Sequence, residues 1–486
     1  MASSQIVRGS VVVAALCLAS PAFSDTYVVP DLSLRWGTWE GWGVSLCWWA
    51  NEYGSRDDLA DLMFSRKIFE FQGNSVPGLG LNIVRYNAGS SGKSTVLGQR
   101  MVASRQLSSG RQMQGFWLDP ASEDVNSFSW DWNLDANQRT MLLKAKERGA
   151  DRFELFSNSP MWWMCANRNP SGAAKADQDN LQPSHFRDHA YYLAAIARVA
   201  RDKWGIHFQS VEPFNEPRTA YWSAAGNQEG CHFEISSQDS VIRLLRRELD
   251  RAGLRDTVVA ASDETSYNQA TDTWRKLGSN AQRCVGRINV HGYQQAGKRD
   301  LLRSTTRPKP IWNSEYGEED PTGLRLARNL TQDFQLLHPS AWCYWQAVDS
   351  GGWGLLSSAR RGGQEVVNNK FFVLAQYSRH IRPGMEIIES GDMNTVIAFD
   401  RVNHRLVVVA VNEEGAQTAH YYMNSFPKFE GAATRWTTRF AGGDRYVERH
   451  DVRLTKKVLE CPLPAGCVQT IEIEGVDLPE VAQGKR

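Results

Sequence analysis

Short apolar runs recur along the first 350 residues, and the segments between them mostly carry a helical pattern of apolar and polar positions. Residues 135–150 illustrate such a segment, with Asp135 as the predicted cap, a charged face and Gly149 as the terminator. Strands that alternate with helices predict βα units and a parallel sheet. The eight apolar runs are 43–46, 81–86, 152–156, 210–214, 257–261, 287–290, 310–312 and 341–344. Eight such units predict an α/β fold, a (β/α)8 TIM barrel with enlarged loops over residues 25–384.

The pattern changes after Pro383 and Gly384. Runs such as 395–399, 406–410 and 468–473 are short and alternate apolar with polar positions, and no helical pattern separates them. This pattern predicts a small C-terminal β-sandwich side domain over 385–476, followed by a tail at 477–486. Residues 25–40, ahead of the first barrel strand, are a candidate for an added strand of that domain. Because no low-complexity linker joins the two domains, we expect them to pack rigidly.

The amino terminus has the features of a secretory signal peptide. Arg8 supplies a positive charge, residues 11–19 are apolar, and Ala22, Phe23 and Ser24 form a small-x-small cleavage site. The alternative, a membrane anchor, requires an apolar run of about 20 residues. We therefore predict that residues 1–24 are removed and that the mature protein is secreted, extracellular and not bound to a membrane.

Seven cysteines remain after removal of the signal, and an odd number in an oxidising compartment leaves at least one free thiol. Cys461 and Cys467 flank a turn-rich segment and form the first predicted disulfide. Cys165 and Cys231, in loops rich in Gly and Asn, form the second. Asn329 begins an Asn-Leu-Thr sequon and is the predicted N-glycosylation site.

Charge and composition limit the classes of binding partner that we expect. Lys and Arg total 55 against 54 Asp and Glu, so no global field draws the chain to nucleic acid or to an anionic membrane. The 18 Trp residues suggest a binding site in which indole rings stack on the flat faces of a ligand. Nothing has the spacing of metal ligands, and we expect neither a metal nor an organic cofactor. We also expect a monomer.

Polar residues follow nearly every apolar run. In a TIM barrel, the groups at the carboxyl ends of the strands converge on one cleft. These strand-end residues include Arg85, Asn158, Asn215, Glu216, Asp263, His291, Tyr293, Glu315 and Gln346.

Glu216 and Glu315 follow the fourth and seventh strands, and a pair of carboxyl groups is what glycoside hydrolysis requires. One group is protonated and gives its proton to the leaving oxygen, whereas the other is ionised and attacks the anomeric carbon. A separation of about 5 Å leads to retention of configuration. The alternative is that either residue is a structural ion-pair partner at the barrel rim. Glu264, Glu318 and Glu319 are rival carboxylates in nearby loops, and Glu212 is a candidate for a buried support.

Several motifs carry a family resemblance. Residues 211–217 (Val-Glu-Pro-Phe-Asn-Glu-Pro) and 312–317 (Trp-Asn-Ser-Glu-Tyr-Gly) resemble glycoside hydrolase clan A. Segments 41–50, 82–87, 156–164 and 291–293 extend the likeness to family 30, and the pattern is most similar to fungal endo-β-1,6-galactanases. The resemblance implies a side β-domain fused to the barrel.

The resemblance also implies roles for the strand-end residues. It makes Glu216 the acid/base and Glu315 the nucleophile. Arg85 would orient Glu315 and favour its ionised form. Asn215 would hold the sugar 2-hydroxyl, and Tyr293 could donate to Glu315 or simply pack.

Other side chains are predicted to bind substrate. Asn158 and His291 end strands, and Trp162 and Trp345 lie beside strand ends, where an indole can cover the apolar face of a pyranose. Core packing is the alternative for any one Trp.

The resemblance implies a secreted, retaining endo-β-1,6-galactanase that acts on the polysaccharide side chains of arabinogalactan or on oligosaccharides derived from them. The alternatives are a β-1,6-glucanase or another family 30 glycosidase, and, from a different class, a carbohydrate-binding protein without catalysis.

Overall fold

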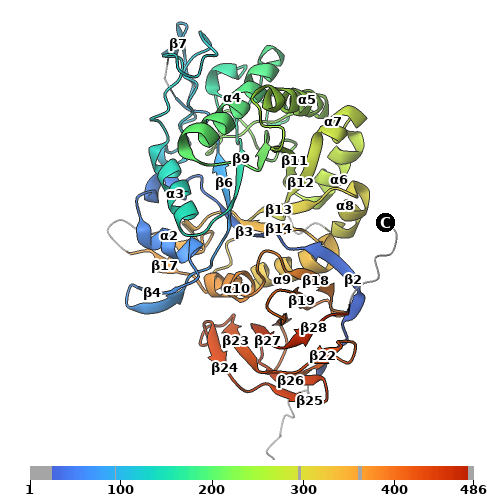
Figure 1. Ribbon diagram of the computed structural model, residues 1–486. Helices are drawn as coiled ribbons and strands as arrows, with labels where there is room; N and C mark the ends of the chain where they lie inside the picture. Colours follow the sequence, from blue (N-terminus) through green and yellow to red (C-terminus); the bar gives the residue numbers. More distant parts are fainter. Residues whose placement is uncertain (1–23, 93–94, 294–296, 359–363, 480–486) are drawn as a thin grey trace, which may run out of the picture.

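The computed structural model describes residues 24–92, 95–293, 297–358 and 364–479, and Figure 1 shows its two parts. The predicted signal peptide, apart from Ser24, lies outside the described residues, and so does most of the predicted tail. Within the described ranges, no helix combines the length and the apolar character needed to cross a membrane.

Eight parallel strands close the barrel that the apolar runs predict, so the predicted TIM barrel is confirmed. Around the barrel their order is β10-β11-β12-β13-β14-β3-β6-β9, and each neighbouring pair is parallel. The strands are β3 (Gly41–Ser45), β6 (Ile83–Asn87), β9 (Arg152–Phe156), β10 (Ser210–Glu212), β11 (Val258–Glu264), β12 (Val285–His291), β13 (Ile311–Tyr316) and β14 (Ala341–Tyr344). Each overlaps one predicted run because strands covered by helices must be apolar on both faces.

Helices surround the barrel. They are α1 (Trp49–Tyr53), α2 (Asp57–Phe64), α3 (Ala136–Glu147), α4 (Phe186–Val199), α5 (Ile235–Arg251), α6 (Tyr267–Lys276), α7 (Ser279–Cys284), α8 (Arg299–Thr306), α9 (Leu324–Gln332) and α10 (Asn369–Ser378). Asp135 occupies the position before α3, but its side chain makes no cap hydrogen bond. Its buried carboxylate accepts hydrogen bonds from Tyr86 and Gln138 instead, because β6 packs directly against this helix.

Short hairpins and bridges extend the barrel loops. They are β4 (Ile68–Phe71) with β5 (Asn74–Pro77), β7 (Thr95–Val96) with β8 (Gln99–Arg100), and a sheet of β15 (Val348–Asp349), β16 (Leu356–Ser357) and β17 (Val366–Val367).

The side domain consists of two sheets that enclose a separate apolar core. One sheet has the order β2 (Asp31–Thr38), β18 (Glu386–Glu389), β19 (Thr395–Asp400), β20 (Arg405–Asn412), β27 (Cys467–Ile473), β23 (Ala433–Arg439) and β24 (Val447–Arg449). The other has β1 (Thr26–Val28), β21 (Gln417–Tyr422), β26 (Val458–Leu463) and β25 (Arg453–Thr455), and β22 (Lys428–Phe429) pairs with β28 (Val476–Asp477). The segment before the barrel thus adds strands to both sheets, and Figure 1 shows β2 beside β18.

Helix α10 joins the two domains. Gln376 donates to the hydroxyl of Thr438 (2.9 Å), and Thr470 donates to the carbonyl of Gln376 (2.6 Å). Val407 and Val468 of the sandwich belong to the same apolar core as the barrel residues. Shared apolar burial and paired polar groups couple the sandwich tightly to the barrel.

The two predicted disulfides are wrong in this structure, where every described cysteine is a free thiol. Cys461 and Cys467 lie on strands of opposite sheets, and each sulfur contacts another partner: Cys467 donates to the Pro464 carbonyl (3.0 Å), and Gln469 donates to Cys461 (3.5 Å). Cys165 and Cys231 are likewise buried and contact backbone carbonyls instead of each other.

The predicted glycosylation of Asn329 is also wrong for the folded protein. The side chain lies buried on α9, where its amide accepts a hydrogen bond from Arg299 (2.7 Å) and donates one to Asp333 (3.3 Å). A sequon carries no information about burial, and a glycan on this nitrogen would have no space.

Candidate active site

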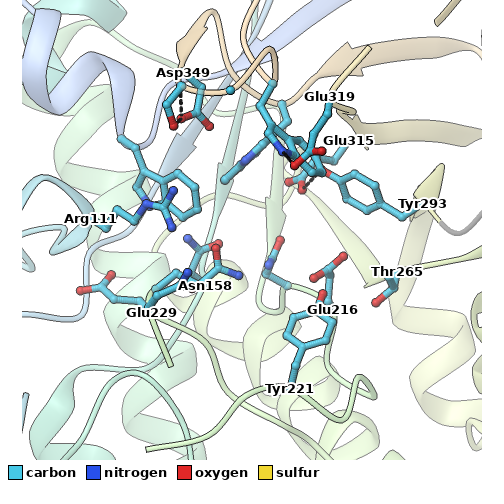
Figure 2. A pocket seen from close by; sticks show the side chains of 18 residues that line it. Arg111, Asn158, Glu216, Tyr221, Glu229, Thr265, Tyr293, Glu315, Glu319 and Asp349 are labelled. Carbon is cyan, nitrogen blue, oxygen red and sulfur yellow. Dashed lines mark hydrogen bonds between the residues drawn. The ribbon is translucent and has the colours of Figure 1, made fainter. Parts of the chain in front are cut away.

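A cavity of about 570 Å³ opens at the carboxyl ends of the barrel strands. Figure 2 shows Glu216 and Glu315 in its wall. Of the other predicted site residues, Asn158, Asn215, Tyr293 and Trp345 also line the cavity. Arg85 and His291 do not line the cavity: both are fully buried directly behind the two glutamates. The prediction that His291 binds substrate is therefore wrong, because its ring contacts the two carboxyl groups from below.

Glu216 follows β10 in an unusual backbone conformation. Its φ is +48°, which a side chain other than glycine adopts only when its surroundings hold it there. The backbone N–H of Glu216 donates to the Asp263 carbonyl (2.9 Å), and its own carbonyl accepts from the Trp222 indole (2.9 Å). These bonds aim the Glu216 carboxyl group into the cavity.

Glu315 lies on β13, and its carboxylate contacts Arg85, Tyr293 and His291. Arg85 Nη1 is 3.1 Å from Oε2, and the Tyr293 hydroxyl donates to Oε1 (3.0 Å). Burial raises the pKa of Glu315 to about 7 and outweighs the lowering by His291 and Arg85.

His291 bridges the two carboxyl groups. Its Nδ1 is 3.1 Å from Glu216 Oε1 and 3.5 Å from Glu315 Oε1, and its Nε2 is 3.2 Å from Asp263 Oδ2. Burial by itself lowers the pKa of His291, but Glu315 and Asp263 together raise it well above its usual value. One buried imidazole therefore holds both glutamates close together.

Arg85 is fully buried beneath the site. Its Nε pairs with Glu154 (2.8 Å), its Nη2 with Asp263 (2.5 Å) and its Nη1 with Glu315. Burial raises the pKa of Asp263, but Arg85 and His291 overcome it and hold this pKa well below its usual range. The sequence places Asp263 at a strand end but does not reveal this role, which depends on contacts across the barrel.

Asn158 and Asn215 present amide groups to the cavity. The Oδ1 atoms of both side chains are buried and have no hydrogen-bond partner among the residues that the structure describes. Buried amide oxygens are normally paired, so these two are suited to accept hydrogen bonds from sugar hydroxyls.

Of the two Trp residues predicted to bind sugar, one lies in the cavity wall and the other in the barrel core. Trp345 lines the cavity and packs edge-on against Trp48, with ring centroids 5.0 Å apart, and the Arg111 guanidinium covers Trp48. Trp162 does not line the cavity: it is fully buried, because the 3-10 turn after β9 directs its side chain into the barrel core. The prediction that Trp162 binds sugar is therefore wrong.

The other carboxylates that the sequence offers as candidates each have a different partner or position from the catalytic pair. Glu318 pairs with the buried Lys370 (2.8 Å), Glu264 accepts from Thr273 (2.5 Å), and Glu212 is buried within the barrel. Glu319 lines the cavity and accepts from the Trp353 indole (2.8 Å).

Sequence reasoning missed several residues of the cavity wall. They are Arg111, Tyr221, Glu229, Thr265 and Asp349. Most of them come from long loops, where no strand end marks the position.

Buried carboxyl groups predict how stability depends on pH. Burial raises the pKa of Asp135 and Glu264 to about 7 and that of Glu229 to about 8. Between about pH 4.5 and 8 the unfolded chain ionises these groups while the folded protein keeps them protonated, so their contribution to stability falls as pH rises. We expect the Tm to be at least about 3 °C higher at pH 5 than at pH 8.

Thermal unfolding across this range tests the expectation, and the Glu264→Gln variant should show a flatter profile. Other groups act in the opposite direction. Burial lowers the pKa of His189 and His338 to about 4, so their contribution to stability falls as pH drops below about 6.5, but the buried carboxyl groups with a raised pKa are more numerous. The contribution of Asp263, whose pKa is lowered, is lost only in stronger acid. A Tm that is equal or higher at pH 8 would contradict the prediction.

Comparisons with known proteins agree with this geometry. Residues 27–279 match the model of O-Glycosyl hydrolase family 30. An endo-β-1,6-galactanase of Hypocrea rufa is 48% identical over 479 residues, which cover 96% of this chain and 99% of that protein.

Solved structures share the fold over nearly the whole chain. A conserved exported protein from Bacteroides fragilis has a TM-score of 0.73 at 20% identity, covering 92% of this chain and 100% of its own. The catalytic domain of GH30 xylanase C from Talaromyces cellulolyticus has a TM-score of 0.70 at 19% identity, covering 92% and 99%. The family match spans more than half of the chain, and the Hypocrea relative matches it almost end to end. The protein therefore belongs to O-glycosyl hydrolase family 30 and is a glycosidase.

Proposed function

We propose that the protein is a retaining endo-β-1,6-galactanase that cleaves the β-1,6-galactan side chains of arabinogalactan. The observation that carries this proposal is the bridged pair of carboxyl groups in a chain that is 48% identical to a galactanase along almost its full length. A shared contact with one His291 nitrogen supports a short separation, near the 5 Å or so of retaining enzymes.

In the first step, Glu315 attacks the anomeric carbon of the bound galactose. The bond from that carbon to the O6 of the next sugar breaks, and Glu216 donates its proton to this oxygen. Arg85 and Tyr293 hold the two Glu315 oxygens, which favours the ionised form and fixes the direction of attack.

In the second step, a water molecule attacks the same carbon, and Glu216, now ionised, takes up the proton of that water. The bond to Glu315 breaks, and the product leaves with its original configuration. Trp345 supports the apolar face of the sugar, and the free amide oxygens of Asn158 and Asn215 accept hydrogen bonds from its hydroxyls.

A polymeric plant substrate is found outside the cell. Residues 1–24 have the composition of a signal peptide, so we propose that the enzyme is secreted. Secretion has its own test: the protein should be found in the culture medium with its amino terminus at residue 25.

Product analysis tests the reaction and the substrate together. The purified enzyme is incubated separately with β-1,6-galactan and β-1,6-glucan, and the products are separated by chromatography. We expect short galacto-oligosaccharides from the first substrate alone. Cleavage of glucan alone would contradict the proposed substrate but agree with the proposed mechanism. Release of oligosaccharides from neither polymer would point to another family 30 substrate or to a binding protein.

A further inference from the structure

One aromatic side chain of the cavity wall has no part in the mechanism above. Tyr221 lines the cavity and is 44% exposed, whereas the adjacent Trp222 is buried. The two rings pack edge to face, with centroids 4.6 Å apart. An aromatic ring that stays accessible inside a cavity is suited to cover the apolar face of a sugar.

The contacts of Trp222 fix the Tyr221 ring beside the acid/base. The Trp222 indole donates to the Glu216 carbonyl (2.9 Å), and the Thr219 N–H donates to the same oxygen (3.2 Å). Gly230 lies so close to Trp222 that an added Cβ would be 2.1 Å from the indole ring. Tyr221 therefore keeps a defined position relative to Glu216, as specific recognition requires.

The catalytic pair divides the ring of barrel strands into two arcs. Glu216 follows β10 and Glu315 lies on β13, so β14, β3, β6 and β9 form one arc and β11 and β12 form the other. The longer arc supplies Trp345 and Asn158, which the mechanism above assigns to the glycone, the sugar that Glu315 attacks. The shorter arc supplies Thr265 to the cavity wall. The cavity therefore continues past Glu216 on the side away from the glycone.

The sugar on the leaving side of the bond must lie beside Glu216. Glu216 gives its proton to the oxygen that joins the two sugars, so this oxygen lies within hydrogen-bond reach of its carboxyl group. Figure 2 shows Tyr221 directly below Glu216, and Thr265 on the opposite side of Glu216 from Asn158. The sugar attached through this oxygen therefore meets the Tyr221 ring.

We propose that the enzyme transfers glycosyl groups to the 6-hydroxyl of a second galactose as well as to water, and that this acceptor stacks on Tyr221. The inference rests on the retaining galactanase activity proposed above. Transfer is the reverse of the first step, so the subsite that holds the leaving galactose also fits an acceptor galactose.

In the transfer step a sugar hydroxyl takes the place of water. The acceptor O6 attacks the anomeric carbon of the glycosyl-enzyme, and the bond from that carbon to Glu315 breaks. Glu216, which is ionised after the first step, takes up the O6 proton, and Glu315 leaves as a carboxylate. The product is a longer chain with a new β-1,6 bond, and the reaction consumes only the donor and the acceptor.

The test measures how the glycosyl-enzyme divides between an added acceptor and water. β-1,6-Galactobiosyl β-fluoride forms this intermediate with no sugar on the leaving side, so its formation does not depend on Tyr221. The acceptors are methyl β-galactopyranoside, which has a pyranose ring to stack, and methanol, which has none. Initial ratios of transfer product to galactobiose do not depend on the fraction of folded enzyme. A displaced Glu216 would slow transfer and hydrolysis alike and leave these ratios unchanged.

The wild type is expected to form methyl β-1,6-galactotrioside beside galactobiose. In Tyr221→Ala the ratio of this trioside to galactobiose should fall about 10-fold, because the acceptor loses the apolar contact with the ring. Transfer to methanol should keep its wild-type ratio. Tyr221→Phe keeps the ring and should keep both ratios. Phe128→Ala removes an exposed aromatic side chain outside the cavity, and this matched control should also keep both.

The inference is overturned if the wild type releases fluoride but forms no methyl galactotrioside. It is also overturned if Tyr221→Ala leaves both ratios unchanged or lowers them equally. Each of these results leaves the galactanase activity standing. If the wild type neither released fluoride nor cleaved β-1,6-galactan, the proposed function would fail and the inference with it.

Discussion

Replacement of Glu315 by Gln is expected to lower kcat for β-1,6-galactan by about 10⁴- to 10⁶-fold and to leave sugar binding nearly unchanged. The amide has the shape of the carboxylate, so it can keep the contacts with Arg85 and Tyr293. It has no charge and cannot form the glycosyl ester. Reducing-sugar release measures kcat, and calorimetric titration with galacto-oligosaccharides measures binding.

The matched control is Glu319→Gln, which changes a neighbouring cavity carboxylate that takes no part in bond making. Its kcat should remain at least 100 times that of Glu315→Gln. Azide then separates the two catalytic roles. In Glu315→Gly it would enter from the vacated face and give the α-galactosyl azide, whereas in Glu216→Ala it would attack the glycosyl-enzyme and give the β-azide. Residual activity above about one per cent in Glu315→Gln would refute the assigned nucleophile.

Replacement of Arg85 by Met is expected to cost about 3–5 kcal/mol of folding free energy and to abolish measurable turnover. Removal of the guanidinium leaves Glu154, Asp263 and Glu315 buried without the cation that they share. Asp263 would lose the main cause of its low pKa, and Glu315 would protonate more readily. Urea unfolding at pH 6 measures the first effect, and kcat/KM on β-1,6-galactan measures the second.

Arg218→Met is the matched control, because Arg218 pairs with Asp272 (2.6 Å) at the partly exposed rim of the barrel. Such a pair contributes about 0–1 kcal/mol. Arg85→Lys keeps the charge but cannot reach three carboxylates from one nitrogen, so its stability should lie between Arg85→Met and the wild type. The network would have no structural role if Arg85→Met unfolded within 1 kcal/mol of the Arg218 control.

The catalytic pair illustrates what sequence patterns can locate. Glu216 and Glu315 each follow an apolar run, and the carboxyl ends of parallel strands meet at one face of a barrel. Asn158, Asn215 and Tyr293 were found in the same way, and all of them line the cavity.

Side chains in loops show the limit of this reasoning. Trp162 and Trp345 both lie beside strand ends, yet one is in the core and the other in the cavity. Glu229 carries no local signal, and its neighbours Ser91 and Met113 are more than 100 positions away in the chain.

The sequence by itself determined the eight barrel strands, the sandwich and the positions of the two glutamates. These follow from local periodicity and from the residue that ends each strand, which short windows of sequence contain. The tertiary structure alone decided which thiols stay free, that Asn329 is buried, and that Arg85, Asp263 and His291 form one charged network beneath the site. Burial and electrostatics depend on neighbours that the chain brings together only when the barrel closes, and no local pattern encodes those distances.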